Sequence, residues 1–354
     1  MADLNTALLE QVSSAIDAGK KLNILGGGSK SFMGRAPIEG ADTIDVSGHT
    51  GIVSYEPIEL VMTARAGTPI TELVAALDEH NQMLAFEPPV LAPGSTLGGT
   101  LATNQSGSGR PWWGSVRDHV LGVRLINGKA EHLRFGGQVM KNVAGYDVSR
   151  LQAGAFGGLG LITEISLKVL PKPAMQRTLT LECSQADALK LMNERAGQPK
   201  PITAAMWHKG VLYTRLAGAA SAVEAAAKLF GGDTLESAES FWQGVADQRH
   251  SFFANEEPLW RFSINSKSDA FDLSGHALID WGGAQRWYSG EYDWQQMVDL
   301  ANSSGGQVSL YRGGERSNEV MHPQSKSVQL LQQRLKASFD PAGTFNPGRV
   351  YSWL

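Results

Sequence analysis

The glycines of this chain are gathered into a few short blocks, and this clustering limits the folds that the chain can adopt. The chain has 354 residues, 40 of them glycine. The densest block runs from Pro93 to Gly109, where glycines alternate with short hydroxyl and amide side chains and no residue is charged. Glycine lets a main chain turn tightly or approach another group closely. The block therefore predicts a segment of backbone that lies against a ligand.

A second glycine block follows the first predicted strand. The apolar run Leu22–Leu25 leads directly into Gly26–Phe32. Successive N–H groups can point into one concavity there, and Ser29, Lys30 and Ser31 add donors and charge, which suits a pyrophosphate. The dinucleotide pattern GxGxxG would need glycine where Ser31 stands, and a P-loop Gly-Lys-Ser/Thr is absent from the sequence. A plain glycine-rich turn is the alternative interpretation.

The predicted elements fall into two groups on either side of Pro171–Pro173. Before it, antiparallel strands are expected at 120–126, 130–135 and 161–170, the first two joined by Asn127-Gly128, a dipeptide that suits a type I′ hairpin turn. After it, strands and helices alternate as in a cap domain whose antiparallel sheet is covered on one face. The sequence predicts an α+β fold with a first domain at 1–171, a cap at 172–335 and a tail at 336–354.

Charge, cysteine content and hydropathy exclude several classes of protein. A net charge of -4 and a pI of about 6.1 provide no basic surface for nucleic acid. The single cysteine, Cys183, excludes an internal disulfide and cannot by itself hold an iron–sulfur cluster. Residues 1–21 are typical of an amphipathic helix rather than a signal peptide, and no apolar run reaches the roughly 18 residues of a membrane span. A cytoplasmic location is expected, with any inner-membrane contact made through partners.

Several motifs together carry a resemblance to a known family. Residues 93–99, 145–147, 157–164 and 346–348 read Pro-Gly-x-Thr-x-Gly-Gly, Gly-Tyr-Asp, Gly-x-x-Gly-x-Ile-Thr-Glu and Asn-Pro-Gly. In this order the chain resembles the D-2-hydroxyacid dehydrogenase branch of the vanillyl-alcohol-oxidase/p-cresol-methylhydroxylase (PCMH) flavoproteins. The resemblance covers residues 20–171 well and the last fifteen passably. It implies a two-subdomain PCMH-type FAD-binding domain to which the C-terminal tail returns.

The resemblance also assigns roles to individual residues. It implies that Gly26–Phe32 wraps the pyrophosphate, that the segment around Thr96 lines the phosphates and ribityl chain, that Ser106 and Gly107 approach the isoalloxazine, and that the backbone of Ile162 meets the adenine side. Lys141, Tyr146 and Asp147 serve either the site or the bracing of the sheet, and this choice stays open. The expected cofactor-binding residues are Gly26, Gly27, Gly28, Ser29, Lys30, Ser31, Phe32, Pro93, Gly94, Ser95, Thr96, Gly98, Gly99, Asn104, Ser106, Gly107, Gly157, Gly160 and Ile162.

The cap departs from the pattern of the family. The branch carries His-x-His and Gly-Asp-Gly-Asn-x-His motifs that hold the substrate carboxylate, often with a metal, and none of the eight histidines here forms them. No metal site is therefore expected, and no catalytic residue is assigned. Arg286 and Arg312 are the candidates for holding a carboxylate, although solvated or salt-bridged arginines are the favoured interpretation. Relatives attach flavin through a histidine where Ser29 and Lys30 stand, so dissociable, non-covalent FAD is expected.

A short FAD domain joined to a cap without catalytic histidines resembles the small FAD-binding subunits of bacterial glycolate oxidase complexes. The resemblance implies an FAD-dependent oxidoreductase that takes part in electron transfer as glycolate is oxidised to glyoxylate. It also implies a larger FAD-binding catalytic subunit and an iron–sulfur subunit as partners, with a small 2-hydroxy acid as the ultimate substrate. Two alternatives stay open: a self-sufficient 2-hydroxy acid dehydrogenase with its own substrate site, and a non-catalytic scaffold subunit.

Overall fold

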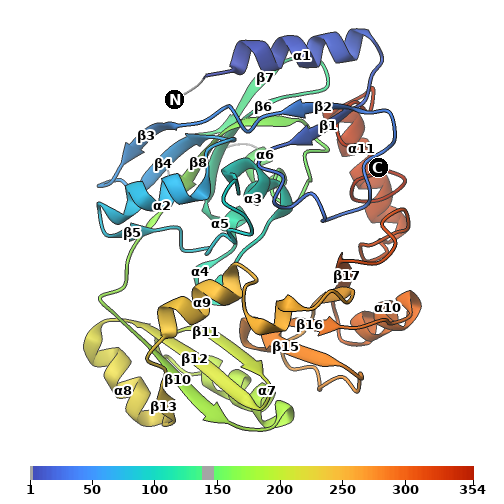
Figure 1. Cartoon of the computed structure of the whole chain (residues 1–354). Coiled ribbons are helices and arrows are strands. Elements are labelled where there is room, and N and C mark those ends of the chain that lie inside the picture. The colour runs from blue at the N-terminus through green and yellow to red at the C-terminus, as the bar shows by residue number, and fades with distance from the viewer. Residues whose placement is uncertain (1–2, 138–146) are drawn as a thin grey trace. The chain divides into compact units, whose positions relative to one another are not determined.

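The computed structural model describes residues 3–137 and 147–354, and the chain divides into two compact units (Figure 1). The first unit contains residues up to 105, residues 115–171 and residues 316–354, and the second contains residues 106–114 and 172–315. This division differs from the expected domains in two places. Residues 106–114 belong to the second unit because Trp112 packs into its apolar clusters. The return to the first unit begins at Arg316, whose guanidinium donates to the carbonyl of Phe32.

An antiparallel sheet forms the centre of the first unit. Its strands lie in the order β3-β4-β8-β6-β7, and its buried core includes Met62, Leu73, Leu97, Leu125 and Ile165. Most of β4 and β8 is buried, which fits their central positions in the sheet. The bounds are β3 Ile52–Glu56, β4 Val61–Arg65, α2 Ile70–Asp78, α3 Leu97–Thr103, α5 Val116–His119, β6 Val120–Ile126, β7 His132–Gly136, α6 Val148–Leu151 and β8 Leu161–Lys168, with β5 Gln82–Met83 paired to β9 Leu170–Pro171.

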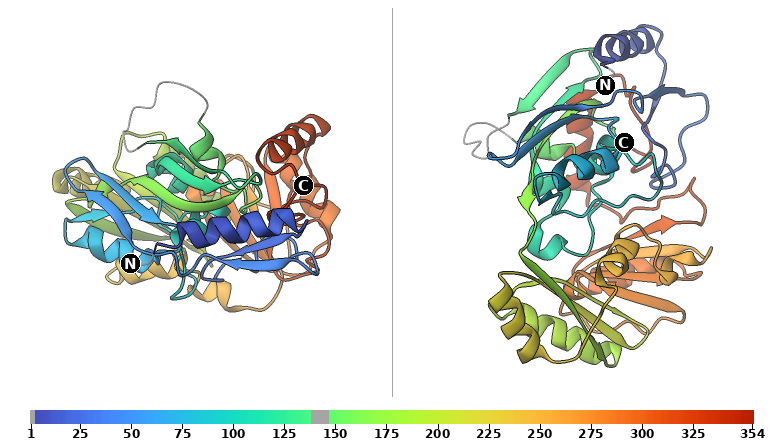
Figure 2. Two further views of the ribbon diagram at one scale, coloured as in Figure 1. Left: turned by 90° about the horizontal axis from the view of Figure 1, so that it is seen from above. Right: turned by 60° about the vertical axis from the view of Figure 1, so that its left-hand side comes forward.

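A smaller substructure of the first unit joins the two ends of the chain. Strands β1 (Leu22–Leu25) and β2 (Asp42–Asp45) pair in parallel, and helix α1 (Asn5–Asp17) lies alongside them (Figure 2). Leu8, Val12 and Ala15 of α1 share an apolar cluster with residues of β1, β2, β6 and β8 and with Phe345. The spacing of these α1 residues places them on one face of the helix, as the amphipathic pattern predicted. The C-terminal segment is therefore part of the core that positions β1.

The second unit is built on an antiparallel sheet in the order β13-β10-β12-β11-β15-β16-β14-β17. Leu212 of β12 faces an apolar cluster with α7, whereas the next residue, Tyr213, stacks on Phe241 of α9. Both faces of the sheet are therefore covered, and the expectation of one covered face was wrong. The elements are α4 Arg110–Trp113, β10 Met175–Glu182, α7 Gln185–Ala196, β11 Ile202–His208, β12 Val211–Gly218, α8 Ala220–Phe230, β13 Asp233–Thr234, α9 Ala238–Ala246, η1 Ser251–Ala254, β14 Leu259–Ser263, β15 His276–Asp280, η2 Trp281–Gly283, β16 Gln285–Ser289, α10 Trp294–Ser303 and β17 Gln307–Arg312.

The hairpin between β6 and β7 pairs as predicted, but its turn does not have the expected form. The last pair of the ladder is Ile126 with His132, so the loop is longer than the two residues of a type I′ turn. Within it Ala130, rather than the Asn-Gly pair, takes a positive φ of 55°. A side chain on Gly128 would meet Asp340, so this glycine is needed for a close tertiary approach. Tertiary packing therefore overrides the local turn preference.

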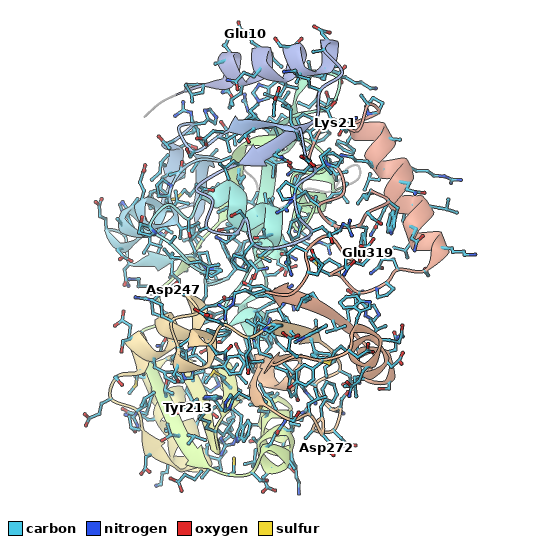
Figure 3. The ribbon with its side chains drawn as sticks, turned by 45° about the vertical axis from the view of Figure 1, so that its right-hand side comes forward. Glu10, Lys21, Tyr213, Asp247, Asp272 and Glu319 are labelled. Atoms are coloured by element: carbon cyan, nitrogen blue, oxygen red, sulfur yellow. The ribbon has the colours of Figure 1, made fainter. Side chains whose placement is uncertain are left out.

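Helix α11 (Lys326–Phe339) lies on the outside of the first unit. Lys336 is its buried residue, whereas Leu330 and Leu331 are 55% and 66% exposed. Side chains of this helix extend away from the ribbon of the unit (Figure 3). Neither α11 nor any other helix in the described parts of the chain combines the length and the apolar character needed to cross a membrane.

Candidate cofactor-binding site

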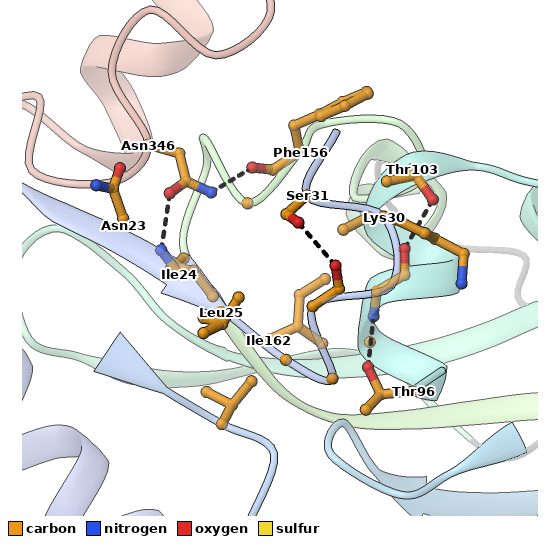
Figure 4. A pocket seen from close by; sticks show the side chains of 18 of the residues that line it. Asn23, Ile24, Leu25, Lys30, Ser31, Thr96, Thr103, Phe156, Ile162 and Asn346 are labelled. Atoms are coloured by element: carbon orange, nitrogen blue, oxygen red, sulfur yellow. Dashed lines mark hydrogen bonds between the residues drawn. The ribbon is translucent and has the colours of Figure 1, made fainter. Parts of the chain in front are cut away.

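A cavity of about 260 Å³ lies within the first unit, at the carboxyl end of β1. Its wall is formed by β1 and the glycine loop after it, by α3, by the segment 156–162 and by two residues of the C-terminal tail (Figure 4). The lining combines apolar side chains, among them Ile24, Val46 and Ile162, with serine, threonine and lysine side chains. A ligand with both an apolar ring and a polar, anionic stretch matches this mixed lining.

The expected cofactor-binding residues are divided by the structure into three sets. Ser106 and Gly107 belong to the second unit, outside the cavity wall. Phe32, Pro93, Gly94, Ser95 and Asn104 also lie outside the wall, although Gly94 and Ser95 contact residues that form it. The cavity is lined by Gly26, Gly27, Gly28, Ser29, Lys30, Ser31, Thr96, Gly98, Gly99, Gly157, Gly160 and Ile162.

Two glycine loops meet with their backbones in contact. A Cβ on Gly27 would lie 1.5 Å from the carbonyl oxygen of Gly94, and a Cβ on Gly26 would lie 2.8 Å from Oγ1 of Thr96. On α3, a Cβ on Gly98 would lie 2.9 Å from the carbonyl oxygen of Ala66. At Gly27 and Gly98 the glycine requirement comes from neighbouring main chain, which cannot move aside like the end of a flexible side chain. This close approach brings the backbones of the two loops together beside one cavity.

Positive charge and hydroxyl groups surround the loop Gly26–Phe32. Lys30 is only 7% exposed, and its ammonium group lies 3.4 Å from the carbonyl oxygen of Pro89 and 3.5 Å from Oγ of Ser29. Burial lowers the pKa of Arg316 to about 10, and the nearby guanidinium of Arg349 adds to the shift. Arg316 remains cationic at neutral pH, since 10 is well above 7. Three cations beside one loop favour an anionic group such as a pyrophosphate.

Two tail residues that the site predictions omitted, Asn346 and Arg349, line the cavity. Oδ1 of Asn346 accepts from the N–H of Ile24 at 2.8 Å, and its Nδ2 donates to the carbonyl of Phe156 at 2.6 Å. Burial lowers the pKa of Arg349. The Asn-Pro-Gly block at 346–348 was the available signal, because it recurs together with the glycine blocks of the FAD domain.

One residue of the cavity wall carries a buried polar atom that the described protein does not satisfy. Asn23 lines the cavity, and among the described residues its buried Oδ1 has no hydrogen-bond partner. Oδ1 of Asn104, which ends α3 in a left-handed conformation, also has no partner among the described residues, but Asn104 lies outside the cavity wall. Buried acceptors are normally satisfied, so the Asn23 oxygen is suited to a donor of a bound molecule. Together with the two glycine loops and the cations, it fits FAD.

Of the three residues with two open interpretations, Lys141, Tyr146 and Asp147, the structure describes Asp147. Lys141 and Tyr146 lie outside the described residues. Asp147 begins helix α6, where its carboxylate accepts from the N–H of Arg150 at 3.1 Å and pairs with the Arg150 guanidinium at 3.1 Å. The contacts of Asp147 thus brace a helix end.

The two arginines considered as carboxylate ligands donate to main-chain carbonyls. Arg286 is fully buried, and its guanidinium donates to the carbonyls of Ser268, Asp269 and Gly283. Arg312 donates to the carbonyls of Phe253 and Asn255, at 2.9 and 3.1 Å. These contacts tie loops to the sheet of the second unit and match the structural interpretation rather than the carboxylate-binding one. Across residues 3–137 and 147–354, no three His, Cys, Asp or Glu side chains form a group that could hold a metal ion.

Comparisons with known proteins agree with this geometry. Residues 6–136 match the family model of the FAD binding domain. The chain is 46% identical to glycolate oxidase subunit GlcE of Escherichia coli (strain K12), over 99% of both chains. It is 29% identical to glycolate oxidase subunit GlcD of Bacillus subtilis (strain 168), over 46% of this chain and 34% of that one. A solved alkyldihydroxyacetonephosphate synthase has a TM-score of 0.67 at 16% identity, covering 96% of this chain and 75% of that one.

These matches identify the fold, the cofactor and the family of the chain. The structural likeness confirms the α+β, PCMH-type fold that the sequence predicted. The FAD binding domain match covers β1, both glycine loops and α3, and so confirms FAD as the expected cofactor. With near-complete coverage at 46% identity, the chain belongs to the family of glycolate oxidase subunit GlcE, an FAD-binding family of oxidoreductase subunits.

Proposed function

We propose that this chain is the FAD-binding subunit of a glycolate oxidase complex and takes part in electron transfer as glycolate is oxidised to glyoxylate. The observation that carries the proposal is the 46% identity to glycolate oxidase subunit GlcE along essentially the whole of both chains. A cavity walled by glycine backbone and flanked by cationic side chains, of which Lys30 is buried, supports it. The activity is proposed for the assembled complex, with this chain as one of its flavin-binding parts.

The first unit supplies the groups that hold FAD in this proposal. The loop Gly26–Phe32 and Lys30 bind the pyrophosphate, Thr96 and the glycines of α3 face the ribityl chain, and Ile24 and Ile162 cover the adenine side. Gly94 and Ser95 support this loop through contact with Gly27 and through Oγ of Ser95, which donates to Oγ of Ser29 at 2.9 Å. When bound, FAD supplies a redox group that accepts electrons from an organic donor and passes them on. The protein binds and orients it.

Partner subunits complete the proposed electron path. The similarity of 46% of this chain to glycolate oxidase subunit GlcD supports a larger, related flavin subunit as the site of glycolate oxidation. The single cysteine of this chain leaves an iron–sulfur cluster to another subunit, because clusters of this kind are held by several thiolates. The proposal includes a cytoplasmic location, with contact to the inner membrane made through these partners.

The test is an anaerobic absorbance titration of the FAD-loaded chain with glycolate, alone and after mixing with its partner subunits. We expect the flavin spectrum of the isolated chain to stay oxidised and to bleach only in the assembled complex. Dithionite serves as the control, since it must bleach the flavin in both samples. Bleaching of the isolated chain by glycolate would make it a self-sufficient dehydrogenase. A complex whose other flavin bleaches while this one stays oxidised would exclude electron transfer through this chain.

A further inference from the structure

The C-terminal segment 344–349 is built into the wall of the FAD cavity. Leu22 donates its N–H to the carbonyl of Thr344 at 2.7 Å, and Asn346 donates its N–H to the carbonyl of Leu22 at 2.9 Å. This places the segment beside β1 through a parallel bridge between Leu22 and Phe345. The strand that leads into the glycine loop is therefore flanked by β2 on one edge and by the tail on the other.

Asn346 joins two walls of the cavity through one side chain. It accepts from the N–H of Ile24 on β1 and donates to the carbonyl of Phe156 in the segment before β8, as the dashed lines of Figure 4 show. The next residue of that segment, Gly157, lies so close that an added Cβ would be 2.8 Å from Nδ2 of Asn346. Without the amide, the Ile24 N–H and the Phe156 carbonyl lose the group that holds them at a fixed separation.

Arg349 fixes the loop that follows the glycines. Its guanidinium donates to the carbonyls of Ser31 at 3.1 Å and Met33 at 2.8 Å, and also to the carbonyl of Arg35. In return, the N–H of Arg35 donates to the carbonyl of Arg349 at 2.8 Å, and Nε of Arg35 donates to the carbonyl of Gly348 at 3.0 Å. The path of residues 31–35 is therefore set by the tail.

A buried ion pair at the end of α11 fixes the start of the segment. Nζ of Lys336 donates to Asp340 at 2.8 Å and to the carbonyls of Gly158 at 2.6 Å and Phe345 at 2.7 Å. The Asp340 carboxylate in turn accepts from the N–H groups of Thr344 and Phe345. At the surface, Lys21 donates to the carbonyl of Ala342, and Glu319 accepts from the N–H of Ser352 (Figure 3). Both ends of the segment are thus tied to the first unit.

We propose that segment 344–349, here termed the C-terminal latch, is a positioning element whose docking is thermodynamically coupled to FAD binding. Docking of the latch sets β1, the glycine loop and the Phe156 segment at the spacing that accepts the dinucleotide. FAD bound between these walls holds them together in return and so stabilises the docked latch. Such coupling is reciprocal by necessity: whatever the latch adds to the affinity for FAD, FAD adds to the docking of the latch. The inference rests on FAD binding and not on the electron-transfer role.

The first measurement compares the affinity of apoprotein for FAD among variants, followed by quenching of flavin fluorescence. Asn346→Ala removes two side-chain hydrogen bonds and Arg349→Met removes those to three carbonyls. Each variant should raise the Kd for FAD by about tenfold or more. The matched control is Arg334→Met on the exposed side of α11, whose Kd should stay within about twofold of the wild type. Circular dichroism at the assay temperature shows which apoproteins are folded.

The second measurement uses the wild-type chain alone and tests the reciprocal effect. Hydrogen exchange of the N–H groups of Leu22, Arg35 and Asn346, which bond to the latch or belong to it, should slow when FAD is added. This readout holds even where a variant fails to fold. The proposed coupling would be overturned if bound FAD left the exchange of these amides unchanged in the wild-type chain. It would also be overturned if the folded variants bound FAD with the wild-type Kd. Wild-type protein that takes up no FAD would overturn the cofactor assignment along with it.

Discussion

Replacing Gly27 by alanine tests whether the two glycine loops must touch. The added methyl group would lie 1.5 Å from the carbonyl oxygen and 2.5 Å from the carbonyl carbon of Gly94. A real Cβ keeps at least 3.0 Å from such atoms, so the two backbones must part by about 1.5 Å. Gly27 has no positive φ, so the substitution acts through this steric contact rather than through backbone strain.

The magnitude follows from the cost of overpacking a closely packed site, about 1–3 kcal/mol. If this strain weakens the free energy of FAD binding by the same amount, the Kd for FAD rises about 5- to 150-fold. The matched control is Gly94→Ala, because a Cβ on Gly94 would lie 3.5 Å from the carbonyl oxygen of Gly27, an ordinary contact. The two glycines face each other, yet only the first should be intolerant.

The assay is titration of apoprotein with FAD for wild type, Gly27→Ala and Gly94→Ala, with thermal unfolding of each apoprotein as a check on folding. We expect a large rise in Kd for Gly27→Ala and a change of about twofold or less for Gly94→Ala. Equal Kd values for the two variants would refute the argument, because they would show that contact between the loops does not shape the cofactor site.

Two further predictions concern the second unit. Burial lowers the pKa of His250 from 6.5 to about 4, with nearby His208 adding to the shift. Between about pH 6.5 and 4, His250 is therefore protonated in the unfolded chain but neutral in the folded chain. The free energy of unfolding falls as the pH drops through that window. His250→Asn, which keeps an acceptor for the N–H of Phe252, should flatten this slope in urea unfolding at pH 7 and pH 5; an unchanged slope would contradict the assignment. Arg286→Met leaves three main-chain carbonyls without their donor, so it should lower the free energy of unfolding by about 2 kcal/mol or more while the Kd for FAD stays at the wild-type value. A raised Kd for FAD with normal stability would show that Arg286 serves the cofactor.

The glycine loops of the site could be predicted from sequence because their requirement is local and chemical. A glycine such as Gly27, within a glycine-rich block, indicates that another group approaches the backbone closely, although it does not identify that group. The fold class was accessible for a similar reason, since alternating strands and the apolar stripe of α1 follow periods that are visible in the sequence. What these signals lack is the identity of the partner: nothing local shows that Gly27 faces Gly94.

The remaining parts of the site depend on contacts between distant residues. Asn346 bonds to Ile24 across 322 positions, and Arg349 to Ser31 across 318. No periodicity or spacing rule reaches that far, so the Asn-Pro-Gly block at 346–348 marks the tail without showing which residues of the first unit it contacts. Ser106 and Gly107 lie outside this cavity wall, and their approach to the isoalloxazine stays a prediction. They continue a glycine-rich run, but the chain leaves the first unit directly after Gln105.

The interrupted course of the chain through its two units affects the order in which they can fold during synthesis. The last strand of the second unit ends at Arg312, and the segment 106–114 that completes this unit is made earlier still. The first unit, by contrast, needs residues 316–354 for the Lys336–Asp340 pair and for the edge of β1. Domains are usually completed in order from the N-terminus as the ribosome proceeds. Here the second unit can be finished first, and a nascent chain that stalls before residue 316 would carry its glycine loops without a site.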